Sequence, residues 1–171
     1  MTADVRRAVL ALGSNRGDRL ETLRRAVKAL ADTPGLRVLA VSPVYETDPV
    51  GGPEQPDYIN AVVLAETSLT PRALLEQAFA VEDAFGRVRD LRWGPRTLDV
   101  DVIALGGLVV SEPDLQVPHP RAHLRAFVLV PWRDVDPAAA LPGVGEVTTL
   151  LASMDESGVR ARPDLTLTAD R

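Results

Sequence analysis

The chain has 171 residues, of which 46% are hydrophobic, and it contains no cysteine. This length suits one compact domain with a full core, so we expect a single domain over residues 1–171. The net charge of -5 argues against a nucleic-acid binder with a basic surface. Without cysteine, disulfides and thiolate metal sites are excluded, and no apolar run reaches membrane-spanning length. We expect a cytoplasmic monomer that binds neither nucleic acid nor membranes.

Apolar runs bounded by Gly, Pro and Asn predict three strands in the first half of the chain. We expect a helix between the first two strands, because Asp18 can cap its start and Glu21 follows three residues later, as in a capping box. The segment between the second and third strands carries four prolines and is expected to be an irregular, functional loop. The predicted strands are residues 7–12, 36–41 and 58–66, and the irregular segment is 42–57.

The second half predicts another helix and one long buried strand. Thr70 and Pro71 take the cap and first-turn positions of the helix. The strand covers 97–105, between glycine- and proline-containing turns. The order strand, helix, strand, strand, helix, strand predicts a ferredoxin-like α+β sandwich, with a βαββαβ core, a mainly antiparallel sheet and helices packed on it. We further expect a short strand at 108–110, helices at 125–132 and 147–154, and a loose tail at 163–171.

Two aspartates interrupt the strand expected over 97–105. Asp99 and Asp101 are two residues apart, so their carboxylates share one face of the strand, roughly 6 to 7 Å apart along it. Mg²⁺ suits such a pair of oxygen ligands without His or Cys beside it. We therefore predict that both aspartates hold one or two Mg²⁺ ions. The alternative is that they only form salt bridges with nearby arginines.

Four arginines precede this strand on a segment that glycine and proline predict to be a loop. They are Arg87, Arg89, Arg92 and Arg96. Guanidinium groups bind phosphate oxygens in a bidentate manner. Carboxylates for a metal beside arginines for phosphate indicate a metal-bound polyphosphate. The glycines near the N-terminus form neither a dinucleotide fingerprint nor a Walker A loop, so if a nucleotide such as ATP binds, it binds without a P-loop.

A second group of residues suits a flat heterocycle. Tyr58 and Asn60 lie two apart on a predicted strand, so an aromatic face and an amide point to the same side. Phe127 can supply the opposite face of a bound ring. His119 stands between two prolines, which stiffen the loop that presents it. Gly13-Ser14-Asn15 is interpreted mainly as a turn that holds a loop beside the site.

One continuous motif holds two of the arginines and both aspartates: Arg92-Trp93-Gly94-Pro95-Arg96-Thr97-Leu98-Asp99-Val100-Asp101-Val102-Ile103. This motif resembles the signature of one known family, the 6-hydroxymethyl-7,8-dihydropterin pyrophosphokinases of folate biosynthesis. Thr47-Asp48-Pro49-Val50-Gly51 and Gln55-Pro56-Asp57-Tyr58-Ile59-Asn60-Ala61 resemble the family's pterin-binding segments. The resemblance spans roughly residues 9–137, and the last thirty residues add little.

The resemblance implies a reaction and a set of roles. The β,γ-diphosphate of ATP would be transferred to the hydroxymethyl group of the pterin, with Mg²⁺, leaving AMP. The catalytic residues would be Arg87, Arg96, Asp99 and Asp101, of which the aspartates bind the metal. ATP would contact Glu82, Arg87, Arg89, Trp93, Arg96, Val102, His119 and Arg125. The pterin would contact Thr47, Val50, Gly51, Tyr58, Asn60, Trp93 and Phe127.

The chain departs from some family members in two places. The stretch between Arg89 and Trp93 is one residue shorter, with Asp90 where a basic residue can occur, and Phe79 replaces a polar residue near the nucleotide. Two other functional classes stay open. A palm-like two-metal nucleotidyltransferase or nuclease also uses Asp-x-Asp but releases pyrophosphate. A non-catalytic RNA-binding module of the same fold would stack bases on aromatic residues, which are only 4% of this chain.

Overall fold

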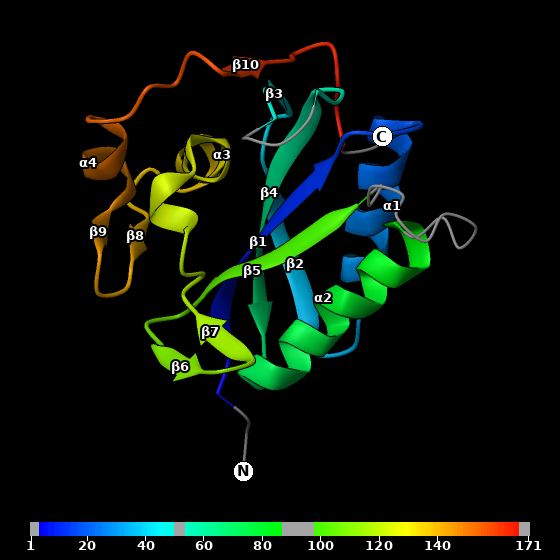
Figure 1. Ribbon diagram of the computed structural model, residues 1–171. Helices are drawn as coiled ribbons and strands as arrows, with labels where there is room; N and C mark the ends of the chain where they lie inside the picture. Colours follow the sequence, from blue (N-terminus) through cyan, green and yellow to red (C-terminus); the bar gives the residue numbers. More distant parts are fainter. Residues whose placement is uncertain (1–3, 50–53, 87–97, 168–171) are drawn as a thin grey trace.

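The computed structural model of the protein describes residues 4–49, 54–86 and 98–167. Its centre is a six-stranded sheet in the order β10-β3-β4-β1-β5, with β2 also paired to β4 (Figure 1). All of these pairings are antiparallel. The strands are β1 (Arg6–Ser14), β2 (Leu36–Val41), β3 (Tyr45–Thr47), β4 (Tyr58–Thr67), β5 (Asp99–Leu105) and β10 (Val159–Ala161).

Helices α1 (Arg19–Ala31) and α2 (Pro71–Gly86) cover one face of the sheet (Figure 1). Both begin where the sequence predicts. The Asp18 side chain accepts a hydrogen bond from the Glu21 N–H (3.1 Å), and Thr70 Oγ1 accepts one from the Ala73 N–H (3.1 Å). The apolar stripes of both helices pack with alternate residues of the strands in one buried cluster. Burial of this stripe, more than helix propensity, holds the two helices in place.

The opposite face of the sheet is only partly covered. A 3₁₀ turn, η1 (Ala122–Leu124), leads into α3 (Ala126–Val135), and α4 (Val147–Leu151) packs beside α3. The small hairpin of β8 (Ala140–Leu141) with β9 (Gly145–Glu146) completes this side. A second hairpin, β6 (Val110–Glu112) with β7 (Leu115–Val117), instead packs with the α1 and α2 cluster, and Arg72 of α2 forms ion pairs with Glu112 and Asp114. Part of β1, β4 and β5 stays open beside α3, and this open area carries the site described below.

The predicted ferredoxin-like α+β fold is confirmed. The elements β1, α1, β2, β4, α2 and β5 follow the predicted βαββαβ order, and their strands lie as β5-β1-β4-β2 in the sheet. Among the residues described, no helix has the length and apolar character needed to cross a membrane.

Two local predictions are wrong. The segment 42–57 is not wholly irregular, because β3 pairs there with β4 and β10. A strand of three residues between prolines gives no pattern of its own and forms because both partners lie beside it. The short strand expected at 108–110 instead covers Val110–Glu112, since the turn after β5 extends further than its two glycines suggest.

The predicted loose tail is also wrong as far as residue 167. Leu167 is 7% exposed and belongs to the cluster under α1 and α2, with Leu165 packed against it. The Nε of Arg24 on α1 donates a hydrogen bond to the Thr166 carbonyl (3.0 Å). The polar composition of this segment concealed two leucines that return the chain to the core.

The packing of Leu167 predicts a measurable contribution to stability. Leu167→Ala should lower the free energy of unfolding by about 2 kcal/mol, because it deletes a nearly buried side chain. Leu124→Ala is the matched control, since Leu124 is 69% exposed and should change stability by less than about 0.5 kcal/mol. Urea unfolding of both variants makes the comparison. Equal stabilities would show that the segment does not pack as described.

Candidate functional site

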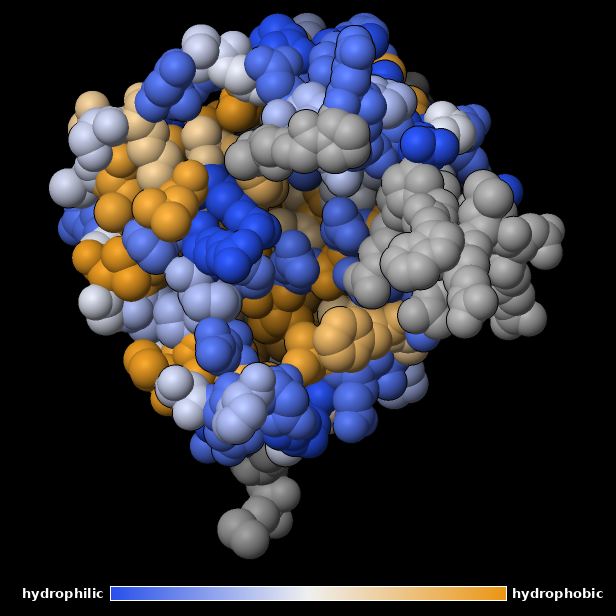
Figure 2. All heavy atoms as spheres, in the orientation of Figure 1, coloured by the Kyte–Doolittle hydropathy of each residue, from blue (hydrophilic) through white to orange (hydrophobic). Residues whose placement is uncertain are grey.

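A cavity of about 730 Å³ opens on the face of the sheet away from α1 and α2. Its floor comes from β1, β4 and β5, one wall from η1 and the start of α3, and another from the end of β3 and residues 155–159. Figure 2 shows this face hollowed near its centre, with hydrophilic and hydrophobic side chains around the hollow. Ring-binding and charged groups can therefore meet in one cavity.

The sheet register places two groups of polar residues in this cavity. Gly13 on β1 pairs with Asn60 on β4 and with Asp99 on β5. Ala11, two residues earlier on the same face, pairs with Asp101. Since neighbouring strands are about 5 Å apart, Asn60 and Asp99 stand roughly 10 Å apart across the small residues of β1. An amide and a carboxylate pair thus flank one shallow floor.

Asn60 is held by hydrogen bonds on both sides of its amide. Its Oδ1 accepts from Thr47 Oγ1 (2.5 Å), and its Nδ2 donates to the Leu12 carbonyl (3.4 Å). Asn60 is 8% exposed and Thr47 is 2% exposed. The carbonyl and amino ends of the Asn60 amide are therefore distinguished, and the amide presents a defined donor and acceptor to a ligand.

Gly13 is required by this arrangement. A Cβ atom at this position would lie 2.7 Å from Asn60 Nδ2 and 3.6 Å from the Tyr58 ring. The turn predicted at Gly13-Ser14-Asn15 is wrong for its first two residues, which belong to β1. Its predicted role beside the loop is confirmed for Asn15, whose Nδ2 donates to Gln55 Oε1 (3.0 Å).

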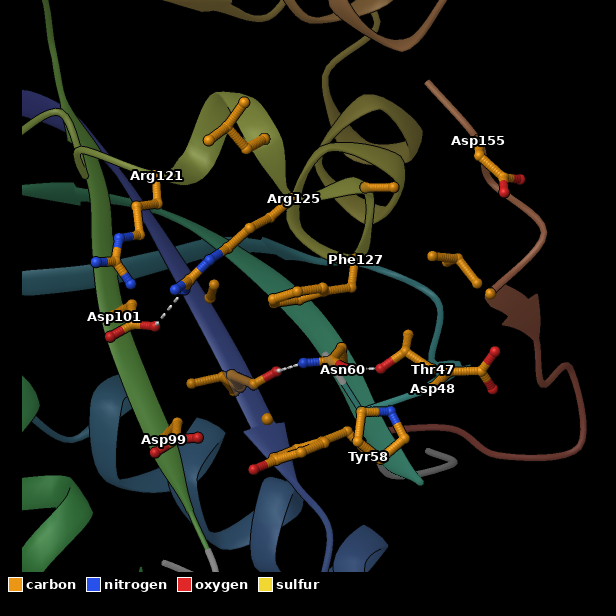
Figure 3. Close-up of a pocket in the computed structure, with 18 of the residues that line it drawn as sticks. Thr47, Asp48, Tyr58, Asn60, Asp99, Asp101, Arg121, Arg125, Phe127 and Asp155 are labelled. Atoms are coloured by element: carbon orange, nitrogen blue, oxygen red, sulfur yellow. Dashed lines mark hydrogen bonds and ion pairs between the residues drawn. The ribbon is translucent and has the colours of Figure 1, made fainter. Parts of the chain in front are cut away.

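Two aromatic rings border the amide. Figure 3 shows Phe127 on one side of Asn60 and Tyr58 on the other, with the Tyr58 hydroxyl directed toward Asp99. Burial raises the pKa of Tyr58, and the negative charge of Asp99 raises it further. Tyr58 therefore stays a neutral hydrogen-bond donor at physiological pH. Two aromatic side chains beside an amide are the groups that bind a flat, polar ring.

The aspartates lie as predicted, on one face of β5. Asp99 and Asp101 both line the cavity, while Val100 between them is buried on the helix side. The Arg125 Nη1 lies 3.9 Å from Asp101 Oδ2, and the Arg125 guanidinium also stands 5.6 Å from the centre of the Phe127 ring (Figure 3). One cation thus connects the aromatic part of the site with its carboxylates.

These carboxylates suit a metal that is shared with a substrate. Within the described ranges, no cluster of three or more His, Cys, Asp or Glu forms a complete protein cage. Asp101 retains 38% of its side-chain surface, so its oxygens are reachable from the cavity. Mg²⁺ is commonly bound by one or two carboxylates, with phosphate oxygens and water completing the octahedron.

His119 lies beside the carboxylates and is half-buried. Its backbone N–H donates to the Ile103 carbonyl (2.8 Å), and its Nδ1 accepts from the Arg121 N–H (3.1 Å). Burial lowers the pKa of His119, as do the charges of Arg125 and Arg121, while Asp101 opposes them. In the neutral imidazole the proton therefore sits on Nε2, which can donate to an anion.

The structure does not bring every predicted ATP-binding residue into the cavity. His119 is near Asp101 but does not line the cavity. Glu82 is 7% exposed, and its Oε1 accepts a hydrogen bond from the Val100 N–H (2.8 Å). Glu82 therefore gives a partner to a backbone N–H group of β5. Val102 is buried in the cluster on the helix side. Phe79, the departure noted on α2, is 50% exposed. Outside the described residues lie Val50, Gly51, Arg87, Arg89, Asp90, Arg92, Trp93 and Arg96.

Sequence reasoning also missed part of the cavity. Arg121 lines it next to the aspartates, as do several residues near the C-terminus. Arg121 follows His119 by two residues, which was a usable signal for an additional cation. The C-terminal residues gave none, because β10 forms by pairing with β3 across more than a hundred residues. These lining residues are Asp155, Ser157, Gly158 and Val159.

Comparison with known proteins shows which family this chain belongs to. The model of the family described as 7,8-dihydro-6-hydroxymethylpterin-pyrophosphokinase (HPPK) matches residues 9–137. The chain belongs to this family. Several relatives are named 2-amino-4-hydroxy-6-hydroxymethyldihydropteridine pyrophosphokinase. The relative from Methylorubrum extorquens is 47% identical, and the match covers 90% of this chain and 96% of the relative. The relative from Pseudomonas aeruginosa is 42% identical, and the match covers 93% of this chain and 98% of the relative. The relative from Mycobacterium tuberculosis is 48% identical, and the match covers 87% of this chain and 84% of the relative.

Solved structures agree in fold at much lower identity. A Plasmodium falciparum HPPK-DHPS structure superposes with a TM-score of 0.70 at 13% identity, covering 88% of this chain. The match covers 46% of that chain, so this HPPK-family chain corresponds to less than half of the fused protein. At this identity the likeness supports the fold and not the details of the site.

The close approach of Gly13 to Asn60 can be tested directly. Gly13→Ala should lower the free energy of unfolding by about 1 to 3 kcal/mol, because a fixed, hydrogen-bonded amide must move to admit the methyl group. Gly107→Ala is the control, since no atom beyond Gly107 and its two chain neighbours would lie within 4 Å of a Cβ at that position. Thermal unfolding of the two variants gives the comparison. An unchanged Gly13→Ala protein would contradict the tight register at Gly13.

Proposed function

We propose that this chain transfers the β,γ-diphosphate of ATP to the hydroxymethyl group of 6-hydroxymethyl-7,8-dihydropterin, giving AMP and the pterin diphosphate in folate biosynthesis. The observation that carries the proposal is that Tyr58, Asn60 and Phe127 line the same cavity as Asp99 and Asp101. Family membership and relatives named pyrophosphokinase support the same reaction.

The pterin is proposed to bind over the β1–β4 half of the floor. Its ring lies between Tyr58 and Phe127, and its polar edge meets the Asn60 amide and Thr47. The hydrogen bonds that fix this amide favour a ring with a matching donor and acceptor pattern over one that lacks it. The hydroxymethyl group then points toward β5.

The triphosphate is proposed to bind over β5. Asp99 and Asp101 would hold Mg²⁺, which neutralises and orients the phosphates when it is bound. Arg125 and Arg121 line the cavity with these carboxylates, and His119 lies close enough to Asp101 for its charge to act on the imidazole; all three can donate to phosphate oxygens. The predicted roles of Arg87, Arg89, Trp93 and Arg96 around ATP, and of Val50, Gly51 and Trp93 around the pterin, stay predictions.

The reaction is an in-line displacement at the β-phosphorus. The pterin hydroxyl oxygen forms a new bond to this atom, and the bond from the β-phosphorus to the oxygen shared with the α-phosphate breaks. AMP leaves with that oxygen, and the hydroxyl proton is released. We assign no general base. The protein's part is to align two bound substrates and to spread cationic groups around the transferred charge.

The product nucleotide tests this proposal. Purified protein is incubated with ATP, Mg²⁺ and the hydroxymethyl pterin, and nucleotides are separated by chromatography. We expect AMP only when the pterin is present, and none with 6-methyl-7,8-dihydropterin, which lacks the attacking hydroxyl group. ADP would mean transfer of the γ-phosphate alone. Release of pyrophosphate would favour the nucleotidyltransferase alternative.

The carboxylate pair gives a second prediction. Asp99→Asn and Asp101→Asn should each lower kcat by at least roughly a hundredfold, since the metal loses an anionic ligand, while pterin binding alone persists. Asp155→Asn, at a lining carboxylate outside the pair, should keep at least about a tenth of the wild-type rate. Calorimetry of pterin binding and initial rates are measured for each variant. Near-wild-type turnover of either pair variant would refute the metal assignment.

Three expectations from the sequence stay predictions. They are the single domain over residues 1–171, the monomeric state and the cytoplasmic location.

A further inference from the structure

Arg160 ties together the ends of the two strands that present the ring-binding residues. It belongs to β10, and its guanidinium forms ion pairs with Asp48 (Nη1 to Oδ1, 2.8 Å) and with Asp57 (Nη2 to Oδ2, 3.0 Å). Asp48 directly follows β3, and Asp57 directly precedes β4. One side chain from the C-terminal part of the chain therefore joins two positions nine residues apart.

The joined ends are next to the floor of the cavity. Thr47 and Tyr58 are the last register pair of the β3–β4 ladder, so Asp48 and Asp57 stand one residue beyond it. Tyr58 borders the cavity, and Thr47 holds the Asn60 amide. A change in the separation of Asp48 and Asp57 would move both of these side chains.

The backbone before Arg160 fits closely against the same place. The Asp48 N–H donates to the Gly158 carbonyl (3.0 Å), and a Cβ on Gly158 would lie 3.2 Å from Asp48 Oδ2. Gly158 and Val159 line the cavity themselves. Residues 155–162, called the C-terminal strap below, thus form a wall whose position is fixed by Asp48 and Asp57.

We propose that Arg160 is a positioning residue for the pterin, which it affects by holding Thr47 and Tyr58 in place through Asp48 and Asp57. The inference rests on the proposed function and adds a pterin-positioning role for one residue of the C-terminal strap, which lies beyond the residues 9–137 matched by the family model. Arg160 does not line the cavity, and its ion pairs are with Asp48 and Asp57 and not with the β5 carboxylates. Its effect should therefore fall on pterin affinity and not on the chemical step.

Arg162 provides a matched control on the same strap. Its guanidinium pairs with Asp164 (2.8 Å) and with Glu46 (3.1 Å), and none of these three residues lines the cavity. Glu46 keeps a second partner in Arg19 (3.1 Å) when Arg162 is changed. The two arginines have similarly exposed side chains, 41% and 32%, so each should contribute little to global stability.

The experiment compares Arg160→Met with Arg162→Met, which both keep the apolar stem and remove the charge. For Arg160→Met we expect the pterin KM to rise roughly tenfold, and the pterin Kd measured by calorimetry without ATP to rise by a similar factor. This is the usual size of the effect when a residue that orients ligand-contacting groups is removed. The kcat at saturating pterin and the KM for ATP should change less than about twofold. Arg162→Met should match the wild type, and both variants should have similar melting temperatures.

Two further variants keep the test decisive. Arg160→Lys retains the charge but cannot bridge two carboxylates with a planar fork, so it should restore pterin affinity only partly. Asp57→Asn removes one arm and should also weaken pterin binding, which decides the matter if Arg160→Met does not fold. An unchanged pterin Kd in Arg160→Met, or in Asp57→Asn, would overturn the inference. A wild-type protein that forms no AMP would instead refute the proposed function.

Discussion

The pairing of β1 with both of its neighbours at Gly13 is the constraint on which the site depends. This one residue faces Asn60 across one ladder and Asp99 across the other. Because the side-chain period of a strand is two, a slip of one residue would turn either the ring-binding side chains or the carboxylates to the helix face. Glycine at this position leaves room for the Asn60 amide. Register and cavity shape therefore have the same cause.

The two halves of the floor differ in how their polar groups are satisfied. On the β4 side, Asn60 and Thr47 are buried and bonded to each other, which suits recognition of an uncharged ring. On the β5 side, Asp101 and Arg125 are partly exposed and separated by 3.9 Å, a distance that leaves both groups available to other ions. A preorganised ring site beside a charged, reachable site suits transfer between a heterocycle and a polyphosphate.

Most of the core fold and half of the site could be predicted from the sequence. Helix caps at Asp18 and Thr70, and the two-residue spacing of Asp99 and Asp101, are local signals that survive in the structure. The errors concern features made by distant partners. A three-residue strand at Tyr45–Thr47 exists because β4 and β10 pair with it, and Arg160 meets Asp48 and Asp57 only after the chain returns. Val102, predicted to contact ATP, does lie on the strand that carries the aspartates, but its side chain is buried on the helix side and not in the cavity.

A crystal structure with Mg²⁺, an ATP analogue that resists cleavage between the α- and β-phosphates, and the hydroxymethyl pterin tests the central claim most directly. The account predicts the ring between Tyr58 and Phe127 with its edge on Asn60, the metal on Asp99 and Asp101, and the hydroxyl oxygen in line with the β-phosphorus. Density for the pterin or the metal elsewhere, with this floor left open to solvent, would contradict it.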